Sequence, residues 1–276
     1  MQAGELLLTK ADVSLAFEAV LTRQEMQATV SGFTLKTPAG DMLSAQAKVT
    51  LPVGPDPSVT IETTYTADLP TLLAPWLPLG RVRAAGEADF TLAGQKIELR
   101  RLQASVTDAA GLDLCKATAL RPFVFDLTTR HAEATGATGA VELVRVALAR
   151  VPLSALPLTM PGAKLGGFVS AGDLVLAVDG DKLTVRAPAA FRLSDVSLTE
   201  QGQPALTGLQ IEARPVFELA GKTGAKLQSG DITVRSSGGT LLLAAKGEAT
   251  QSAAAGLQGA MTFTLEVPAL AAQPMF

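Results

Sequence analysis

Apolar and polar side chains alternate along most of this chain, and turn-forming residues interrupt the alternation roughly every ten residues. In one segment Phe90 and Leu92 lie on the same face of a predicted strand. After a turn at Gly94-Gln95, Ile97 and Leu99 resume that face. A two-residue turn between runs of period two is the strongest local signal of a β-hairpin.

The same pattern returns further along the chain, where Leu174, Leu176 and Val178 precede the sequence Asp-Gly-Asp at 179–181. Leu183 and Val185 then continue the alternation. Residues 141–148 fit a helix through Val141, Val144 and Leu148 and a strand through Val144, Val146 and Leu148, and the neighbouring strands favour a strand. The sequence therefore predicts an all-β fold, an elongated and twisted antiparallel sheet with little helix.

A weak internal repeat divides the predicted sheet. Two Pro-rich connectors, 68–80 and 151–162, each lead through Ala-Gly, at Gly86 and at Gly172, into a hairpin. Proline removes a backbone donor, so neither connector is expected to be a central strand. Trp76 in the first connector is interpreted as a side chain that packs over the end of the sheet. The repeat predicts one continuous elongated domain made of segments 1–67, 68–150 and 151–266, with a further repeat starting at 267–276.

Composition narrows the classes of function. Of 276 residues, 47% are apolar but only 4% are aromatic, so the predicted apolar face is mainly aliphatic. The net charge is −3 and the chain has no basic stripe, which argues against nucleic-acid binding. The first residues lack the pattern of a secretory signal, and no apolar run is long enough to span a bilayer. We expect an internal segment of a longer protein.

Residues that usually carry chemistry are scarce. Cys115 and His131 are the single cysteine and histidine of the sequence, and we interpret them as a packed thiol and a solvated imidazole. Asp179 with Asp181, and Asp108 with Asp113, could be carboxylate pairs or calcium ligands, but their spacing alone is weak support; Asp-Gly-Asp at 179–181 is interpreted as a turn. We therefore expect no enzymatic activity, no metal site and no cofactor.

Arg100-Arg101 interrupts the alternation between Leu99 and Leu102, which predicts a β-bulge. Binding of a phosphate or a lipid headgroup by these two arginines is the less favoured alternative, because adjacent surface arginines are usually solvated.

The order of connector, glycine-bounded segment and aliphatic hairpin resembles the AsmA-like family, which includes the TamB-like and YhdP-like inter-membrane lipid transport proteins of diderm bacteria. The resemblance rests on Gly80–Gly86 and Gly166–Gly172 and on the hairpins that follow them. It implies a U-shaped sheet whose hydrophobic groove holds acyl chains, in a segment of a membrane-anchored periplasmic protein. The implied partners are phospholipid, or another acyl-chain lipid, and components of the inner and outer membranes.

A sheet with one aliphatic face must cover that face with another layer, a membrane or an apolar ligand. We expect one continuous aliphatic lining along both repeats. The predicted lining residues are Val82, Phe90, Leu92, Ile97, Leu99, Leu102, Phe123, Phe125, Leu174, Leu176, Val178, Leu183, Val185, Phe191 and Leu193. The alternative function is a structural β-repeat, such as a stalk or an adhesin scaffold, whose faces close on each other. A carbohydrate-active enzyme is disfavoured because the chain has one Trp and one Tyr for stacking on sugars.

Overall fold

The computed structural model describes residues 11–37, 40–54, 58–68, 82–129, 131–134, 139–155, 163–179, 182–200, 203–220, 224–252 and 256–258. Within these ranges the regular structure is all β-strand apart from one three-residue 3-10 helix. The predicted all-β fold is thus confirmed. The chain divides into two compact units, residues 1–127 and 128–276. The repeat boundaries expected at 68 and 151 fall inside these units. The boundary between the compact units, at residues 127 and 128, therefore differs from the repeat boundaries.

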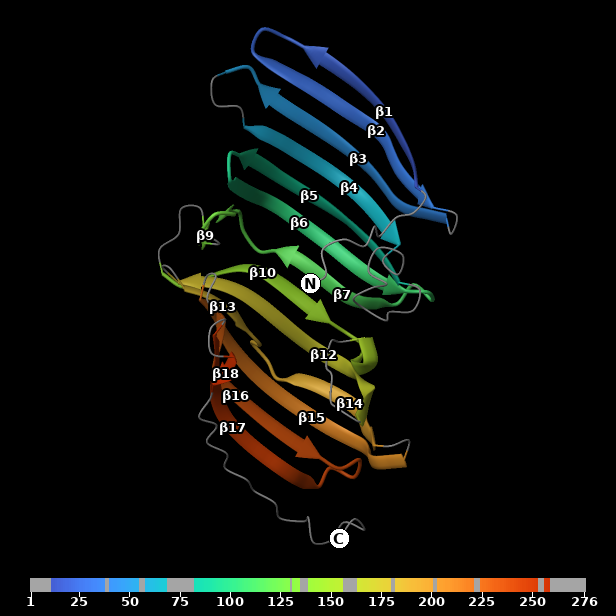
Figure 1. Ribbon diagram of the computed structural model, residues 1–276, viewed down its shortest axis with the longest axis vertical. Helices are drawn as coiled ribbons and strands as arrows, with labels where there is room; N and C mark the ends of the chain where they lie inside the picture. The colour runs from blue at the N-terminus through green and yellow to red at the C-terminus, as the bar shows by residue number, and fades with distance from the viewer. Residues whose placement is uncertain are drawn as a thin grey trace. The chain divides into compact units, whose positions relative to one another are not determined.

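The first unit is an antiparallel meander (Figure 1). Its strands are β1 (Asp12–Leu21), β2 (Glu25–Thr37), β3 (Gly40–Pro52), β4 (Val59–Asp68), β5 (Val82–Ala93), β6 (Lys96–Asp108), β7 (Asp113–Ala119) and β8 (Phe123–Asp126). Each strand from β1 to β6 pairs with the next one in the chain. Strand β6 then pairs with both β7 and β8, one after the other along its length.

The register of the first unit confirms the hairpin and the bulge expected from sequence. Ala93 pairs with Lys96 around a two-residue turn in which Gly94 has a φ of 57°. This left-handed conformation suits glycine, which carries no Cβ to oppose it. The pairing of β5 with β6 shifts between Asp89 and Phe90, so Arg100 is the extra residue of a β-bulge.

The second unit contains the remaining strands (Figure 1). They are β9 (His131–Ala134), β10 (Val141–Leu148), β11 (Val151–Pro152), β12 (Ala163–Asp179), β13 (Lys182–Arg186), β14 (Phe191–Glu200), β15 (Gln203–Ala220), β16 (Gly224–Arg235), β17 (Leu241–Ser252) and β18 (Gly256–Gln258). The 3-10 helix η1 (Leu153–Ala155) follows β11.

Two long strands, β12 and β15, organise the second unit. The shorter strands β13 and β14 lie between them and pair with both. Strand β10 pairs with the other side of β12, which confirms the strand interpretation of residues 141–148. The pair Asp179–Lys182 confirms the second predicted hairpin, although Gly180 and Asp181 lie outside the described residues.

The described part of the second connector is consistent with its proline content. Val151 and Pro152 pair with Val169 and Phe168 as the two-residue strand β11, and η1 follows immediately. A short pairing of this kind tolerates Pro152, because few ladder hydrogen bonds are required of it. The first connector with Trp76 lies, apart from Asp68, outside the described residues, as do residues 156–162 and the expected repeat start at 267.

Gly86 and Gly172 both lie inside strands and against a neighbouring strand. A Cβ on Gly86 would meet the carbonyl oxygen of Gln103 and, 3.0 Å away, the hydroxyl of Tyr65. A Cβ on Gly172 would collide with the ring of Phe191 on β14. Both glycines therefore leave room for an aromatic side chain of the adjacent strand, although at Gly86 the nearest obstacle is backbone.

We expect Gly172→Val to lower the free energy of unfolding by about 1–3 kcal/mol, because Phe191 must leave its position over the strand. Gly32→Val in β2 is the matched control, since nothing lies within 4 Å of a Cβ at that glycine. Urea unfolding of both variants measures the difference. Equal unfolding midpoints for the two variants would show that the Phe191 contact does not constrain residue 172.

Candidate functional site

The first unit carries apolar side chains on one face of its sheet across all eight strands. Residues directly opposite one another in adjacent strands share a face. Phe90 is opposite Ile61 of β4 and Leu99 of β6, and Leu99 is opposite Phe123 of β8. Following these pairs defines the apolar face of the first unit. Its larger members include Val13, Leu15, Phe17, Leu21, Met26, Val30, Phe33, Leu35, Leu43, Val49, Leu51, Val59, Ile61, Phe90, Leu92, Ile97, Leu99, Leu102, Val106, Phe123 and Phe125.

Most of this apolar face is half-buried, and its β1 edge is exposed. Ile61, Phe90 and Leu99 keep an intermediate exposure although they stand in the middle of the sheet. Among the described residues, the buried hydrophobics of this unit are Met42, Ala67, Val82, Leu114 and Phe123. Apolar area that stays in contact with water is unfavourable, at about 25 cal/mol per Å². The face is therefore a surface on which an apolar partner gains free energy by binding.

The few hydroxyls of this face do not form a recognition site. Thr63 Oγ1 donates a hydrogen bond to the carbonyl oxygen of Gln46, 2.9 Å away, on the adjacent strand. Tyr65 carries a second hydroxyl on this face, and the positions beside it are small, since Tyr65 is opposite Gly86 and Gly86 is opposite Ala104. The face thus offers apolar contact area but few hydrogen-bonding groups that would fix the orientation of a ligand.

The structure brings the predicted lining residues of the first unit together. Phe90 and Leu92 of β5 are opposite Leu99 and Ile97 of β6, which in turn are opposite Phe123 and Phe125 of β8. Val82 and Phe123 are more buried than the other predicted lining residues of this unit, since they are only 4% and 7% exposed. These two side chains belong to the packed interior rather than to an accessible surface.

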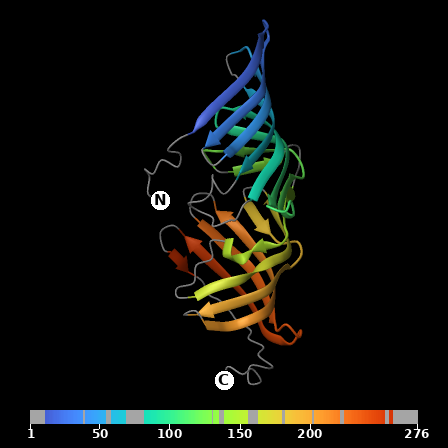
Figure 2. The ribbon, with the colours of Figure 1, turned by 90° about the vertical axis from the view of Figure 1, so that its right-hand side faces the viewer.

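The second unit also has an apolar face, but η1 covers part of it. Leu153 of η1 is 2% exposed and packs with Val169 of β12 and Val196 of β14. Phe191, Leu193, Leu209 and Ile211 pack around this cluster. In Figure 2 the strands of the unit curve around the side on which η1 lies. Phe191 and Leu193, predicted as lining, are therefore partly covered by the chain itself.

The predicted lining residues nearer β10 share one face as expected. Leu176 is opposite Val144 of β10 and Val185 of β13, and Val178 is opposite Leu183. Leu174 is opposite Val146 on the same face. Leu174, Leu176, Leu183 and Val185 are half-buried, whereas Val178 is buried. Half-exposed aliphatic area therefore remains beside the cluster of Leu153.

Val175 shows that a side chain on the opposite, polar face is also buried. It lies between Arg145 of β10 and Arg186 of β13, and its exposure is 0%. Glu142 bridges the two arginines, with its Oε2 3.8 Å from Arg145 Nη2 and its Oε1 hydrogen-bonded to Arg186 Nη2. The aliphatic stems of paired arginines can cover an apolar side chain in this way.

The polar face of the first unit carries ion pairs instead of a charged site. Arg100 Nη2 lies 3.2 Å from Asp89 Oδ1, and Arg101 Nη1 lies 3.4 Å from Glu87 Oε1. Arg100 also donates to Thr91 Oγ1. Carboxylates of β5 thus neutralise both arginines, which weakens the alternative of phosphate or headgroup binding.

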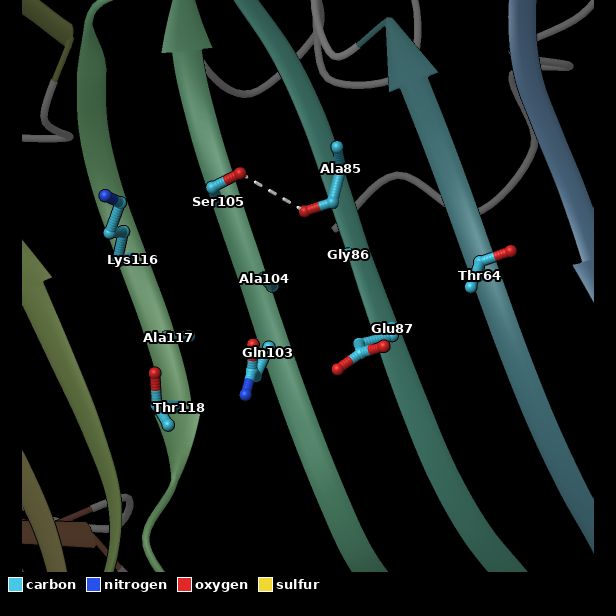
Figure 3. Close-up of a pocket in the computed structure, with 10 residues that line it drawn as sticks. All are labelled: Thr64, Ala85, Gly86, Glu87, Gln103, Ala104, Ser105, Lys116, Ala117 and Thr118. Atoms are coloured by element: carbon cyan, nitrogen blue, oxygen red, sulfur yellow. Dashed lines mark hydrogen bonds between the residues drawn. The ribbon is translucent and has the colours of Figure 1, made fainter.

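A shallow hollow of about 380 Å³ lies on the same polar face (Figure 3). Thr64, Glu87, Gln103, Lys116 and Thr118 surround it. Glu87 is paired with Arg101, and Lys116 Nζ lies 2.7 Å from Asp113 Oδ2. With its two charged groups already neutralised, the hollow supports no specific chemistry.

The remaining residues considered as candidates have structural roles. Asp108 Oδ1 accepts hydrogen bonds from the backbone N–H groups of Ala110 and Leu112, so its carboxylate stabilises a turn. His131 is less exposed than expected, because a quarter of its side chain is exposed and its Nε2 lies 3.6 Å from Glu133 Oε1. Burial raises the pKa of the Cys115 thiol. No group of three or more potential metal ligands occurs among the residues that the structure describes.

The predicted lining did not include the part of the apolar face formed by β1 to β4, nor Leu153 as the residue that covers the apolar face of the second unit. The alternation of Val30, Val49 and Ile61 with polar neighbours was a usable signal. No comparable pattern in the sequence indicates the role of Leu153. Its position over Val169 and Val196 depends on the path of the chain after β11.

Comparison with protein-family models, curated proteins and solved structures found no match to this chain. In the described ranges, no helix has the length and apolar character needed to cross a bilayer.

Proposed function

We propose that this chain is a non-enzymatic lipid-binding segment of a bacterial envelope protein that holds acyl chains on the apolar faces of its sheets. Its place is the periplasm, within a longer membrane-anchored protein that works between inner- and outer-membrane components. Each unit carries an apolar face of the kind that would line the aliphatic β-groove implied by the resemblance to AsmA-like proteins.

One observation carries the proposal: apolar side chains from eight strands stand in register on one face of the first unit, and most remain half-exposed. An acyl chain lying across the strands would follow a row of opposite residues such as Ile61, Phe90 and Leu99. Burial of that row would contribute about 25 cal/mol for each Å² of apolar area removed from water.

The chemistry of the face favours lipid tails over a hydrogen-bonding ligand. Ligand sites of high specificity combine an apolar lining with a few placed polar groups. Thr63 is already hydrogen-bonded to the backbone of β3, and the ion pairs that Glu87 and Asp89 form with the two arginines of β6 stand on the opposite face. A surface without directional contacts lets an acyl chain bind in many positions, as a conduit requires.

The packing around Leu153 favours a second candidate, a structural β-repeat without a ligand. In the second unit the chain itself covers Val169 and Val196, as expected if apolar faces close internally. This observation concerns only part of one unit, whereas the face of the first unit is more open.

Solvent extraction of the purified protein, followed by mass spectrometry, tests the proposal. We expect co-purifying phospholipid, or another lipid with acyl chains, at a constant ratio to protein. A matched preparation of Phe90→Asp should carry much less lipid, because a charged group on the face must lose hydration when a tail covers it. Protein that folds normally but contains no lipid would favour the structural repeat.

Cys115 provides an independent test, because it stands on the apolar face opposite Val106. Its raised pKa, caused by burial, keeps the reactive thiolate scarce at neutral pH, so alkylation should be slow and should accelerate as the pH rises. We expect removal of lipid to increase the alkylation rate at fixed pH, and added phospholipid to restore protection. Unchanged rates would place the bound lipid away from β7.

A further inference from the structure

Strand β1 is an edge strand whose side chains are exposed along its whole length. All ten residues from Asp12 to Leu21 are exposed, and in the described structure β1 pairs only with β2. Val13, Leu15, Phe17, Val20 and Leu21 are 63%, 55%, 60%, 63% and 74% exposed. This concentration of large apolar side chains on an edge is the most unusual surface feature of the first unit.

The hydrogen bonds with β2 show which backbone groups of β1 face outward. The N–H of Thr22 donates to the carbonyl oxygen of Glu25, and the carbonyl oxygen of Ala16 accepts from Ser31 Oγ. Even-numbered residues thus direct their backbone groups toward β2. The odd-numbered residues Val13, Leu15, Phe17, Ala19 and Leu21 direct theirs away from the sheet, because these directions alternate along a strand.

Natural edge strands are usually short or contain lysine or proline, and these features discourage pairing with another strand. Strand β1 has ten residues and contains no Lys, Arg, Pro or Gly. We propose that the edge of β1 binds the β1 edge of a second copy of this chain, in an antiparallel pair centred on Phe17.

The sequence of β1 is complementary to itself in this register. Phe17 faces Phe17 of the other copy, Leu15 faces Ala19, and Val13 faces Leu21, so that outward backbone groups meet outward backbone groups. The two acidic residues avoid each other directly, because Glu18 faces Ala16 and Asp12 faces Thr22. Like charges directly opposite would destabilise the pair. The two Glu18 carboxylates become diagonal neighbours, which leaves a weak repulsion.

This pairing has a two-fold axis perpendicular to the sheet, so it is isologous and closes at the dimer. It also keeps the apolar faces of both first units on the same side, as one continuous surface. The pairing itself does not depend on bound lipid, and its failure would leave the proposed lipid binding intact.

Sedimentation equilibrium of the full chain, with and without lipid, tests the dimer. We expect a reversible dimer in both cases. Ala19→Pro removes an outward N–H without breaking a hydrogen bond to β2, and it should raise the dissociation constant at least about tenfold. Glu18→Gln should lower that constant about two- to fivefold, because the diagonal repulsion disappears. A monomer at all concentrations would overturn the proposal.

Cysteine cross-linking in a Cys115→Ala background tests the register. Phe17→Cys should form a disulfide-linked dimer under mild oxidation, since directly opposite residues lie within disulfide range. Val13→Cys is similarly exposed but should not cross-link to itself, because the two copies of residue 13 lie at opposite ends of the pair. An equimolar mixture of Val13→Cys and Leu21→Cys should cross-link. Equal self-linking at 13 and 17, or none at 17, would contradict the proposed register.

Discussion

Leu176→Asp is expected to abolish lipid binding by the second unit while leaving a folded and soluble protein. Leu176 lies on the apolar face between Val144 and Val185, and it is half-exposed. Without lipid the new carboxylate reaches water, so the fold tolerates it. With an acyl chain on this face, the carboxylate would have to lose its hydration, which costs several kcal/mol. Titration with a fluorescent fatty acid, together with circular dichroism, measures both properties.

Val196→Asp is the matched control for this experiment. Val196 belongs to the apolar interior formed with Leu153 and Val169, and it is only 3% exposed. A carboxylate at this position would be buried without a partner, so the variant should unfold or aggregate. If Leu176→Asp unfolds in the same way, the face around Leu176 is closed and the structural repeat is the better account.

Leu153→Ala is expected to lower the free energy of unfolding by about 2–5 kcal/mol, the range for leucine truncation in packed interiors. Leu153 is 2% exposed, although its helix η1 has only three residues. The loss therefore comes from its contacts with Val169 and Val196 rather than from helix stability. Chemical unfolding, monitored by far-UV circular dichroism of the backbone, measures the change.

Leu127→Ala provides the comparison, because Leu127 is 48% exposed and its truncation should change stability by no more than about 0.5 kcal/mol. A similarly small effect of Leu153→Ala would mean that η1 does not hold the second unit together. It would also remove the observation that favours the structural repeat.

The local β-structure of this chain could be predicted from sequence because its signals are short-range. The alternation around Phe90 and Ile97 determines which side chains share a face, and Gly94 marks the turn. The double arginine marked the bulge for the same reason, since an extra residue breaks a pattern of period two.

The packing on the apolar faces could not be predicted from sequence, because it depends on contacts between distant segments. Nothing near Leu153 in the sequence indicates that it covers Val169 and Val196. The burial of Val175 was equally unpredictable, since it stands on the polar face between Arg145 and Arg186 of two neighbouring strands. The burial of Val82 and Phe123 could not be predicted for the same reason: alternation assigns a face, and burial depends on what packs against it.

Site-specific photo-cross-linking tests the central claim most directly. A benzophenone amino acid is placed at Leu102 on the apolar face of β6 or at the next residue, Gln103, on its polar face, and the protein is irradiated with bound phospholipid. The account predicts covalent lipid adducts at position 102 and few at position 103. Equal labelling at both positions, or no adduct at position 102 in protein that carries lipid, would contradict it.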